Sequence, residues 1–214
     1  MASALVLNIH SETPELRKIQ KVAEILKSGG VILYPTDTGF ALGCELSNRE
    51  AIDKIRRIRN LQPHKELTFL CSSLSNISEF AKVSNQAYKI LKRLIPGPYT
   101  IILPASKNVP KFAQDDKRST AGIRVPENDL CQTLLQYLES PLISISAKND
   151  DVDYDDYDDF ADSFFNKVDL IIKSDQYYFL GESTVIDMTT DAFKIVRQGA
   201  NIEKALEFIN NDEI

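Results

Sequence analysis

The sequence predicts a single α/β domain built on a twisted, open, mixed sheet with flanking helices, and three observations lead to that prediction. The chain has 214 residues, of which 43% are hydrophobic, enough for one substantial core. Helical and strand-like segments alternate early in the chain, whereas strand-like segments cluster late, which favours a mixed sheet over a purely parallel one. No internal repeat or Gly/Ser-rich linker interrupts the pattern, so we expect one domain over 1–214.

The first predicted helix lies in "TPELRKIQKVAEILKSGG". Thr13 is the expected N-cap, Pro14 suits the first turn, and Gly29 and Gly30 end the helix. Its apolar face comprises Leu16, Ile19, Val22, Ala23 and Leu26.

The remaining elements follow from the same reading of periodicity and turn residues. "VILYPTDTGFALGC" predicts strand structure interrupted by a turn at 35–39, and "NREAIDKIRRIRN" a helix with one basic face. Further strands are expected at 66–73, 99–106, 120–126, 141–147, 168–174, 183–188 and 193–199. Further helices are expected at 85–95, 129–140, near 160–165 and at 201–210.

Composition excludes several classes of protein. The formal net charge of -6 argues against broad, nonspecific nucleic-acid binding, which needs a basic field. No apolar run approaches the ~20 residues that span a bilayer, and the N-terminal residues lack a basic signal-peptide region, so we expect a cytoplasmic protein without a membrane partner. The widely spaced Cys44, Cys71 and Cys131 are expected to be reduced core residues.

Charge is unevenly distributed along the chain. Arg56, Arg57 and Arg59 fall within four residues, and Lys65 follows a short turn. Such a cluster could grip phosphates, with arginines forking onto the oxygens, or it could be a solvated helix face. In contrast, "DDVDYDDYDD" holds seven aspartates in ten residues, and we expect residues 150–159 to form a solvated loop that repels anionic ligands.

Polar residues also occur within the predicted strands and at their ends. "YPTDTGFALGC" places two threonines around Asp37, in a pattern typical either of an ordinary turn or of a site that a ligand approaches closely. The chain has neither a P-loop nor a GxGxxG motif. Each further polar residue could be an ordinary exposed one, but ligands of open α/β sheets bind beside strand ends. These residues are Thr120, Arg124, Ser144, Ser146, Ser183 and Arg197.

The motifs "GGVILYPTDTGFALGC", "RIRNLQPHK", "PGPYT", "TAGIRVP", "SISA", "STVID" and "VRQG" follow one another in the order found in a known family. Between about residues 14 and 199 the chain resembles the YrdC-like family of threonylcarbamoyl-AMP synthases, and "ALGC" and "RSTAGIRVP" resemble its YciO-like branch most. The resemblance implies an open α/β fold with a large basic cavity. It also implies that L-threonine, bicarbonate or CO2, and ATP give threonylcarbamoyl-AMP and pyrophosphate, towards the threonylcarbamoyl modification of adenosine in tRNA.

The same resemblance implies roles for individual residues. ATP is then a substrate, Mg2+ accompanies it, and no side chain is assigned as a nucleophile. The implied L-threonine-binding residues are Thr38, Arg124, Ser144 and Ser183. The implied ATP-binding residues are Arg57, Arg59, Lys65, Thr120, Ser146 and Arg197.

Two departures from the synthase pattern favour an alternative function. Lys148 stands where the synthases carry asparagine, and lysine only donates hydrogen bonds, whereas an asparagine amide both donates and accepts. The aspartate-rich stretch follows directly. The alternative is therefore a YciO-like relative that binds a nucleotide or RNA, including double-stranded RNA or tRNA, without efficient synthase activity.

Overall fold

Ten strands form one sheet in the computed structural model, which describes residues 3–61, 67–113, 119–148 and 156–211. Lys65 and most of the predicted acidic loop lie outside the described residues. The strand order is β1-β8-β2-β3-β7-β4-β6-β5-β9-β10. The strands are β1 (Leu5–Ile9), β2 (Ile32–Pro35), β3 (Phe40–Glu45), β4 (Thr68–Leu70), β5 (Tyr99–Pro104), β6 (Thr120–Arg124), β7 (Leu142–Ser146), β8 (Leu170–Ser174), β9 (Thr184–Asp187) and β10 (Lys194–Arg197).

Pairing within the sheet is mixed, as the sequence predicts. β1 and β2 run parallel to β8, β4 runs parallel to β6, and β5 runs parallel to β9, while the other neighbours are antiparallel. The outer strands β1 and β10 do not pair with each other, so the sheet stays open.

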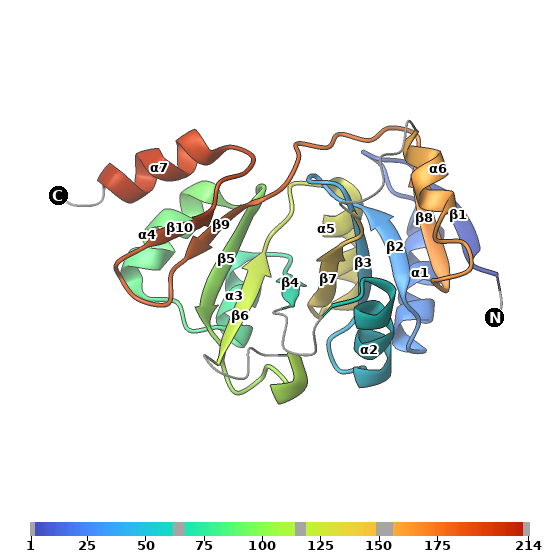
Figure 1. The fold of residues 1–214 in the computed structure, drawn as a ribbon, viewed down its shortest axis with the longest axis horizontal. Coiled ribbons are helices and arrows are strands. Elements are labelled where there is room, and N and C mark those ends of the chain that lie inside the picture. The colour runs from blue at the N-terminus through green and yellow to red at the C-terminus, as the bar shows by residue number, and fades with distance from the viewer. Residues whose placement is uncertain (1–2, 62–66, 114–118, 149–155, 212–214) are drawn as a thin grey trace.

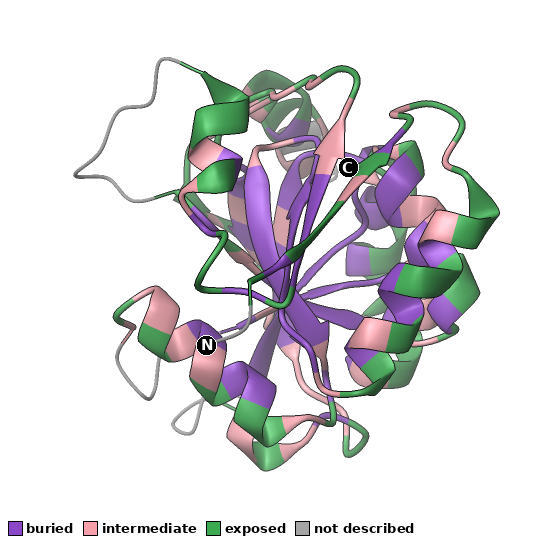
Figure 2. Ribbon diagram, turned by 90° about the vertical axis from the view of Figure 1, so that its right-hand side faces the viewer, coloured by how far each residue is buried: buried purple, intermediate pink, exposed green. Residues whose placement is uncertain are grey.

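Helices cover both faces of the sheet. They are α1 (Leu16–Lys27), α2 (Arg49–Ile58), α3 (Leu74–Phe80), α4 (Asn85–Leu94), α5 (Asp129–Leu138), α6 (Tyr157–Asp162) and α7 (Ile202–Asn211), with a 3-10 turn at Lys111–Ala113. In Figure 1, α5 lies behind β7, whereas α2 lies on the opposite side beside β3. One apolar cluster joins α2, α3 and α4 to the sheet, and a second joins α1 and α5 to the other face. Buried residues accordingly run through the middle of the molecule, between exposed helix surfaces (Figure 2).

Most predicted elements are confirmed, and the differences have local causes. The apolar face of α1 is buried at Ile19, Val22, Ala23 and Leu26. Its N-cap is Glu15, however, and not Thr13, because the Thr13 hydroxyl and backbone N–H both contact the ring nitrogen Nδ1 of His10 at 3.1 Å. Strand β1 and helix α3 were not predicted, and α6 begins at Tyr157, so the last residues of the acidic run start a helix.

The three cysteines are free and buried, as predicted. Burial raises the pKa of the Cys44 and Cys71 thiols from 9.0 to about 12. Over the described ranges, we find no helix with the length and apolar character needed to cross a bilayer.

Candidate functional site

The register of four central strands brings small polar residues onto one face of the sheet. Ser144 on β7 is paired with Gly43 on β3 and with Thr68 on β4, and Thr68 is paired in turn with Gly122 on β6. Because side chains alternate along a strand, residues two positions away share this face. Ser146 therefore lies on the same face as Ser144, and Thr120 and Arg124 lie on the same face as Gly122.

These strand residues are polar and yet largely withdrawn from water. Thr120 is 4% exposed, and Arg124 and Ser144 are each 7% exposed. Ser146, at the end of β7, is exposed. Buried polar groups need hydrogen-bond partners, so the contacts of this face reveal how it is organised.

The turn between β2 and β3 is held together by its own threonine. The Thr36 hydroxyl donates to the carbonyl of Gly39 at 2.7 Å and accepts from the backbone N–H of Thr38 at 3.1 Å. Gly39 has φ +139°, a backbone region that favours glycine. The turn is thus a defined structure that presents Asp37 and Thr38.

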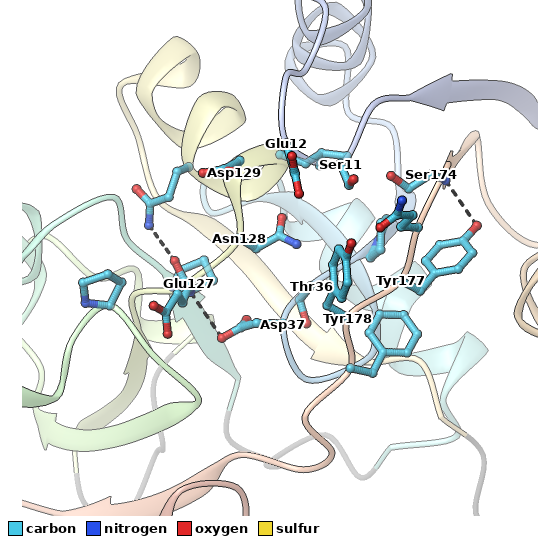
Figure 3. Close-up of a pocket in the computed structure, with 17 residues that line it drawn as sticks. Ser11, Glu12, Thr36, Asp37, Glu127, Asn128, Asp129, Ser174, Tyr177 and Tyr178 are labelled. Atoms are coloured by element: carbon cyan, nitrogen blue, oxygen red, sulfur yellow. Dashed lines mark hydrogen bonds between the residues drawn. The ribbon is translucent and has the colours of Figure 1, made fainter. Parts of the chain in front are cut away.

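Arg124 is fixed against this turn. Its guanidinium donates to the carboxylate of Asp37 and to the hydroxyl of Thr38. The other oxygen of Asp37 accepts from the backbone N–H of Glu127 at 3.2 Å (Figure 3). The side chains of Arg124 and Asp37 are 8% and 4% exposed, so this is a buried ion pair. The structure therefore brings together Thr38 and Arg124, which the sequence assigns to one ligand.

Ser144 has a partner that the sequence did not suggest. The hydroxyl of Tyr34, a fully buried residue on β2, donates to Ser144 Oγ at 2.7 Å. The bond crosses strand β3, which lies between β2 and β7.

A second group surrounds Ser183. Its hydroxyl contacts Thr100 Oγ1 at 2.9 Å, and its carbonyl accepts from Arg197 Nη2 at 2.8 Å and Nε at 3.1 Å. Arg197 also lies 3.4 Å from Glu182 in an exposed ion pair. Ile101 on β5 pairs with Ile123 on β6, so Thr100 stands across from Arg124 in the antiparallel register and connects the two groups.

The three arginines of the predicted basic cluster differ in their contacts and in their exposure. Arg56 donates to the carbonyl of Phe112 at 3.1 Å and lies 3.5 Å from Asp53, so it ties α2 to the 3-10 turn. Arg57 is exposed, and its Nε donates to the Asp53 carbonyl at 3.3 Å. Arg59 is the half-buried C-cap of α2. Arg57 and Arg59 stay the predicted phosphate contacts within the described part of this stretch.

The segment between β8 and β9 crosses the end of the turn. The backbone N–H of Leu180 donates to the carbonyl of Asp37 at 2.9 Å. The Phe40 ring packs on Phe160, Tyr177 and Phe179 with centroid distances of 5.2 to 5.4 Å. The residue that follows the turn is therefore anchored in an aromatic cluster that also includes helix α6.

Behind Asp37 lies a cavity of about 430 Å³ (Figure 3). It opens where the parallel strands β1, β8 and β2 end. Its lining includes Glu12, Asp37, Glu127 and Asp129, and none of the described residues that line it is a lysine, arginine or histidine. This is not the basic cavity that the family resemblance implies, and it includes none of the predicted site residues. The basic cavity stays a prediction, which we associate with the sheet face that carries Arg124 and Ser144. Among the described residues, no three His, Cys, Asp or Glu side chains form a group that could hold a metal ion.

Tyr34, Asp37 as the partner of Arg124, and Thr100 were missed as site residues. "PTDTG" gave a signal for Asp37, since a carboxylate between two threonines in a turn needs a partner. No signal in the sequence pointed to Tyr34 or Thr100, because their contacts depend on which strands become neighbours in the sheet.

The comparisons with known proteins agree with the fold. A model of the Sua5, YciO and YrdC proteins, described as "Telomere recombination", matches residues 24–199. The uncharacterized protein YciO of Escherichia coli strain K12 is 40% identical over 195 residues, which cover 89% of this chain and 93% of that protein. A threonylcarbamoyl-AMP synthase of Hydrogenovibrio crunogenus is 32% identical over 136 residues, which cover 62% of this chain and 73% of the synthase.

Two crystal structures are similar over nearly the whole chain. That of E. coli YciO matches with a TM-score of 0.87 and 37% identity, covering 95% of this chain and all of that one (100%). That of Pyrococcus abyssi Sua5, complexed with L-threonine, matches with a TM-score of 0.86 and 26% identity, covering 96% of this chain and 61% of the Sua5 chain.

Proposed function

Because the chain belongs to the Sua5/YciO/YrdC family, we propose that it binds L-threonine and ATP and joins them, with bicarbonate or CO2, into threonylcarbamoyl-AMP. The family includes threonylcarbamoyl-AMP synthases, and a related Sua5 chain has been crystallised with L-threonine. This activity would supply the threonylcarbamoyl group for the modified adenosine of tRNA.

The observation that carries the proposal is the buried group formed by Arg124, Asp37 and Thr38. An amino acid presents a carboxylate and an amine close together. A guanidinium and a carboxylate held side by side match that charge pattern, and the hydroxyl of Thr38 adds a neutral partner. In the proposal Arg124 binds the threonine carboxylate, while Ser144 and Ser183 contact the same ligand.

The reaction needs positioning more than a nucleophilic side chain. The threonine amine attacks CO2, a nitrogen–carbon bond forms, and the amine gives up a proton; when bicarbonate is the source, one water is released. A carbamate oxygen then attacks the α-phosphorus of ATP, the bond between the α-phosphorus and the bridging oxygen breaks, and pyrophosphate leaves. Cations that neutralise the phosphates lower this barrier. We assign that role to Arg57, Arg59 and Arg197, with Thr120 and Ser146 as hydroxyl contacts.

Two further contributors stay proposals. Lys65 would add a charge at the phosphates, although it lies outside the described residues. Mg2+ would arrive bound to ATP, as part of the substrate.

The test is pyrophosphate release by the purified protein with ATP, Mg2+ and bicarbonate, measured with and without L-threonine. The proposal expects release that depends on threonine and a product with the mass of threonylcarbamoyl-AMP. D-threonine is the matched control, because it has the same composition but cannot present its carboxylate, amine and hydroxyl in the same arrangement.

A second candidate function rests on the sequence identities between this chain and its relatives. The chain is 40% identical to uncharacterized YciO proteins but 32% identical, over a shorter stretch, to the synthase of H. crunogenus. In addition, Lys148 is exposed just after the end of β7, and its backbone N–H donates to the hydroxyl of Ser146 at 3.3 Å. This candidate is a nucleotide- or RNA-binding protein without efficient synthase activity. Salt-sensitive RNA binding that is lost when Arg57 and Arg59 are replaced, without threonine-dependent turnover, would favour it.

A further inference from the structure

Tyr34 makes an unusual contact for a core tyrosine. Its side chain is fully buried in the apolar cluster beneath α1 and α5, and its hydroxyl reaches Ser144, a polar residue on the same face of the sheet, at 2.7 Å. The two residues are 110 positions apart in the chain. A buried tyrosine hydroxyl needs a partner, and most find a backbone carbonyl or water, whereas this one ends on a side chain of the candidate site.

Gly43 makes the contact possible. It lies on β3, between the strands that carry Tyr34 and Ser144, and it is paired with Ser144. A Cβ atom at Gly43 would stand 2.7 Å from Tyr34 Cε1 and 3.0 Å from Leu142 Cδ2. Any other residue here would therefore push the ring away from Ser144. The backbone of Gly43 is not in the left-handed region, so its conformation does not require glycine. Glycine is needed here because it leaves room for the Tyr34 ring.

The direction of the bond determines what Ser144 can do. Burial raises the pKa of Tyr34 well above its ordinary value, so the phenol keeps its proton. The geometry has the phenol donating and Ser144 Oγ accepting. A serine hydroxyl has one proton and two lone pairs. With one lone pair occupied by Tyr34, Ser144 retains its own proton and one lone pair for other groups.

We propose that Tyr34 is a positioning residue that holds the Ser144 hydroxyl with its proton available to the candidate site, and that the ligand atom at Ser144 is an acceptor oxygen. Carboxylate, carbamate and phosphate oxygens belong to that class, whereas an ammonium group does not. The inference deepens the proposed function and depends on it for the identity of the ligand.

The test compares Tyr34→Phe with a matched control, Tyr99→Phe. Tyr99 is also buried, at 1% exposure, and its hydroxyl donates to the backbone carbonyl of Asn201 at 3.1 Å. Both variants lose one buried hydroxyl and one hydrogen bond, so both should lower the melting temperature similarly. Only Tyr34→Phe should weaken ligand binding, by about 3- to 10-fold, the typical effect of one hydrogen bond.

The variant Ser144→Ala tests whether Tyr34 affects ligand binding through Ser144. If Tyr34 acts through Ser144, the double variant Tyr34→Phe/Ser144→Ala binds no more weakly than Ser144→Ala alone. The substrate whose KM rises, with kcat little changed, shows which oxygen lies at Ser144: L-threonine for a carboxylate, ATP for a phosphate. Tyr34→Phe that behaves like Tyr99→Phe, or Ser144→Ala that binds as wild type does, overturns the inference.

Calorimetry with ATP, L-threonine and inorganic phosphate separates this inference from the proposed function. If the wild type releases no threonine-dependent pyrophosphate but binds ATP or phosphate, and Tyr34→Phe weakens that binding, the proposed reaction fails and the inference stands. If the wild type binds none of the three probes, both fail.

Discussion

The proposed site has an amino-acid half, which would bind L-threonine, and a nucleotide half, which would bind ATP. The side chains of the two halves differ in burial and in hydrogen bonding. The first half consists of Arg124, Asp37, Thr38 and Ser144, all hydrogen-bonded within the protein, and Arg124 and Ser144 are buried. The second half relies on longer cations nearer to water: Arg57 is exposed, and the Arg197 side chain is 45% exposed.

Because of this difference, we expect the amino-acid half to determine which ligand binds and the nucleotide half to attract phosphates. A buried, hydrogen-bonded group cannot rearrange without leaving a charge or further polar atoms unpaired, so it discriminates between ligands by shape and hydrogen bonding. Exposed cations attract phosphates over a longer range, but salt screens them. Predictions for the two halves should therefore differ in size and in their dependence on salt.

The largest effect should follow Arg124→Ala. The substitution leaves the carboxylate of Asp37 buried without its cation, and breaking a buried pair in this way lowers the free energy of unfolding by about 3–5 kcal/mol. It should also abolish the dependence on threonine while ATP binding falls less. Urea unfolding and separate binding titrations with L-threonine and ATP measure the two effects.

The double variant Asp37→Asn/Arg124→Met provides the control for this prediction. It removes both charges, so it should recover much of the lost stability without recovering threonine binding. Equal losses of threonine and ATP binding in Arg124→Ala would contradict the assignment of Arg124 to the amino-acid half.

Arg197→Ala should have the next largest effect, because Arg197 belongs to the nucleotide half but hydrogen-bonds to Ser183 of the amino-acid half. It removes the bonds to the carbonyl and hydroxyl of Ser183, which in turn contacts Thr100. Losing charge-assisted bonds of this kind costs a site about 10-fold or more in affinity. We expect both KM values to rise, measured by steady-state kinetics. A rise for ATP alone would confine Arg197 to the nucleotide half.

Replacing Arg57 should have a smaller and salt-dependent effect. An exposed cation contributes about 1 kcal/mol or less, so Arg57→Ala should weaken ATP binding several-fold at low salt and hardly at all at high salt. Arg49→Ala is the matched control at the other end of α2, since Arg49 is also exposed and lies 3.9 Å from Asp53. Equal effects of the two variants would indicate that only net charge matters.

The effect that is smallest at neutral pH concerns the buried thiols, which change stability only under alkaline conditions. Because the pKa values of Cys44 and Cys71 are about 12 in the folded protein and 9.0 ordinarily, the unfolded chain loses protons between pH 9 and 12 that the folded chain keeps. Their contribution to stability is therefore complete below pH 9 and is lost as the pH rises towards 12. Unfolding titrations should show a shallower decline for Cys44→Ala/Cys71→Ala than for wild type, and parallel declines would refute the assignment.

Sequence periodicity predicted most elements, and alternation correctly placed Ser144 and Ser146 on one face. Alternation cannot say which strands become neighbours, because pairings such as β1 with β8 join residues far apart in the chain. Tyr34 and Thr100 were missed for that reason. The N-cap of α1 was misplaced because His10, outside the helix, binds Thr13. Family motifs gave Thr38 and Arg124 as ligand-binding residues, but not the contact between them.

The most direct test of the central claim is pyrophosphate release measured with and without L-threonine in the presence of ATP, Mg2+ and bicarbonate. The proposed function predicts release that rises with threonine concentration, saturates, and loses this dependence in Arg124→Ala. Release at the same rate without threonine, or no release from a protein that still binds ATP, would contradict it.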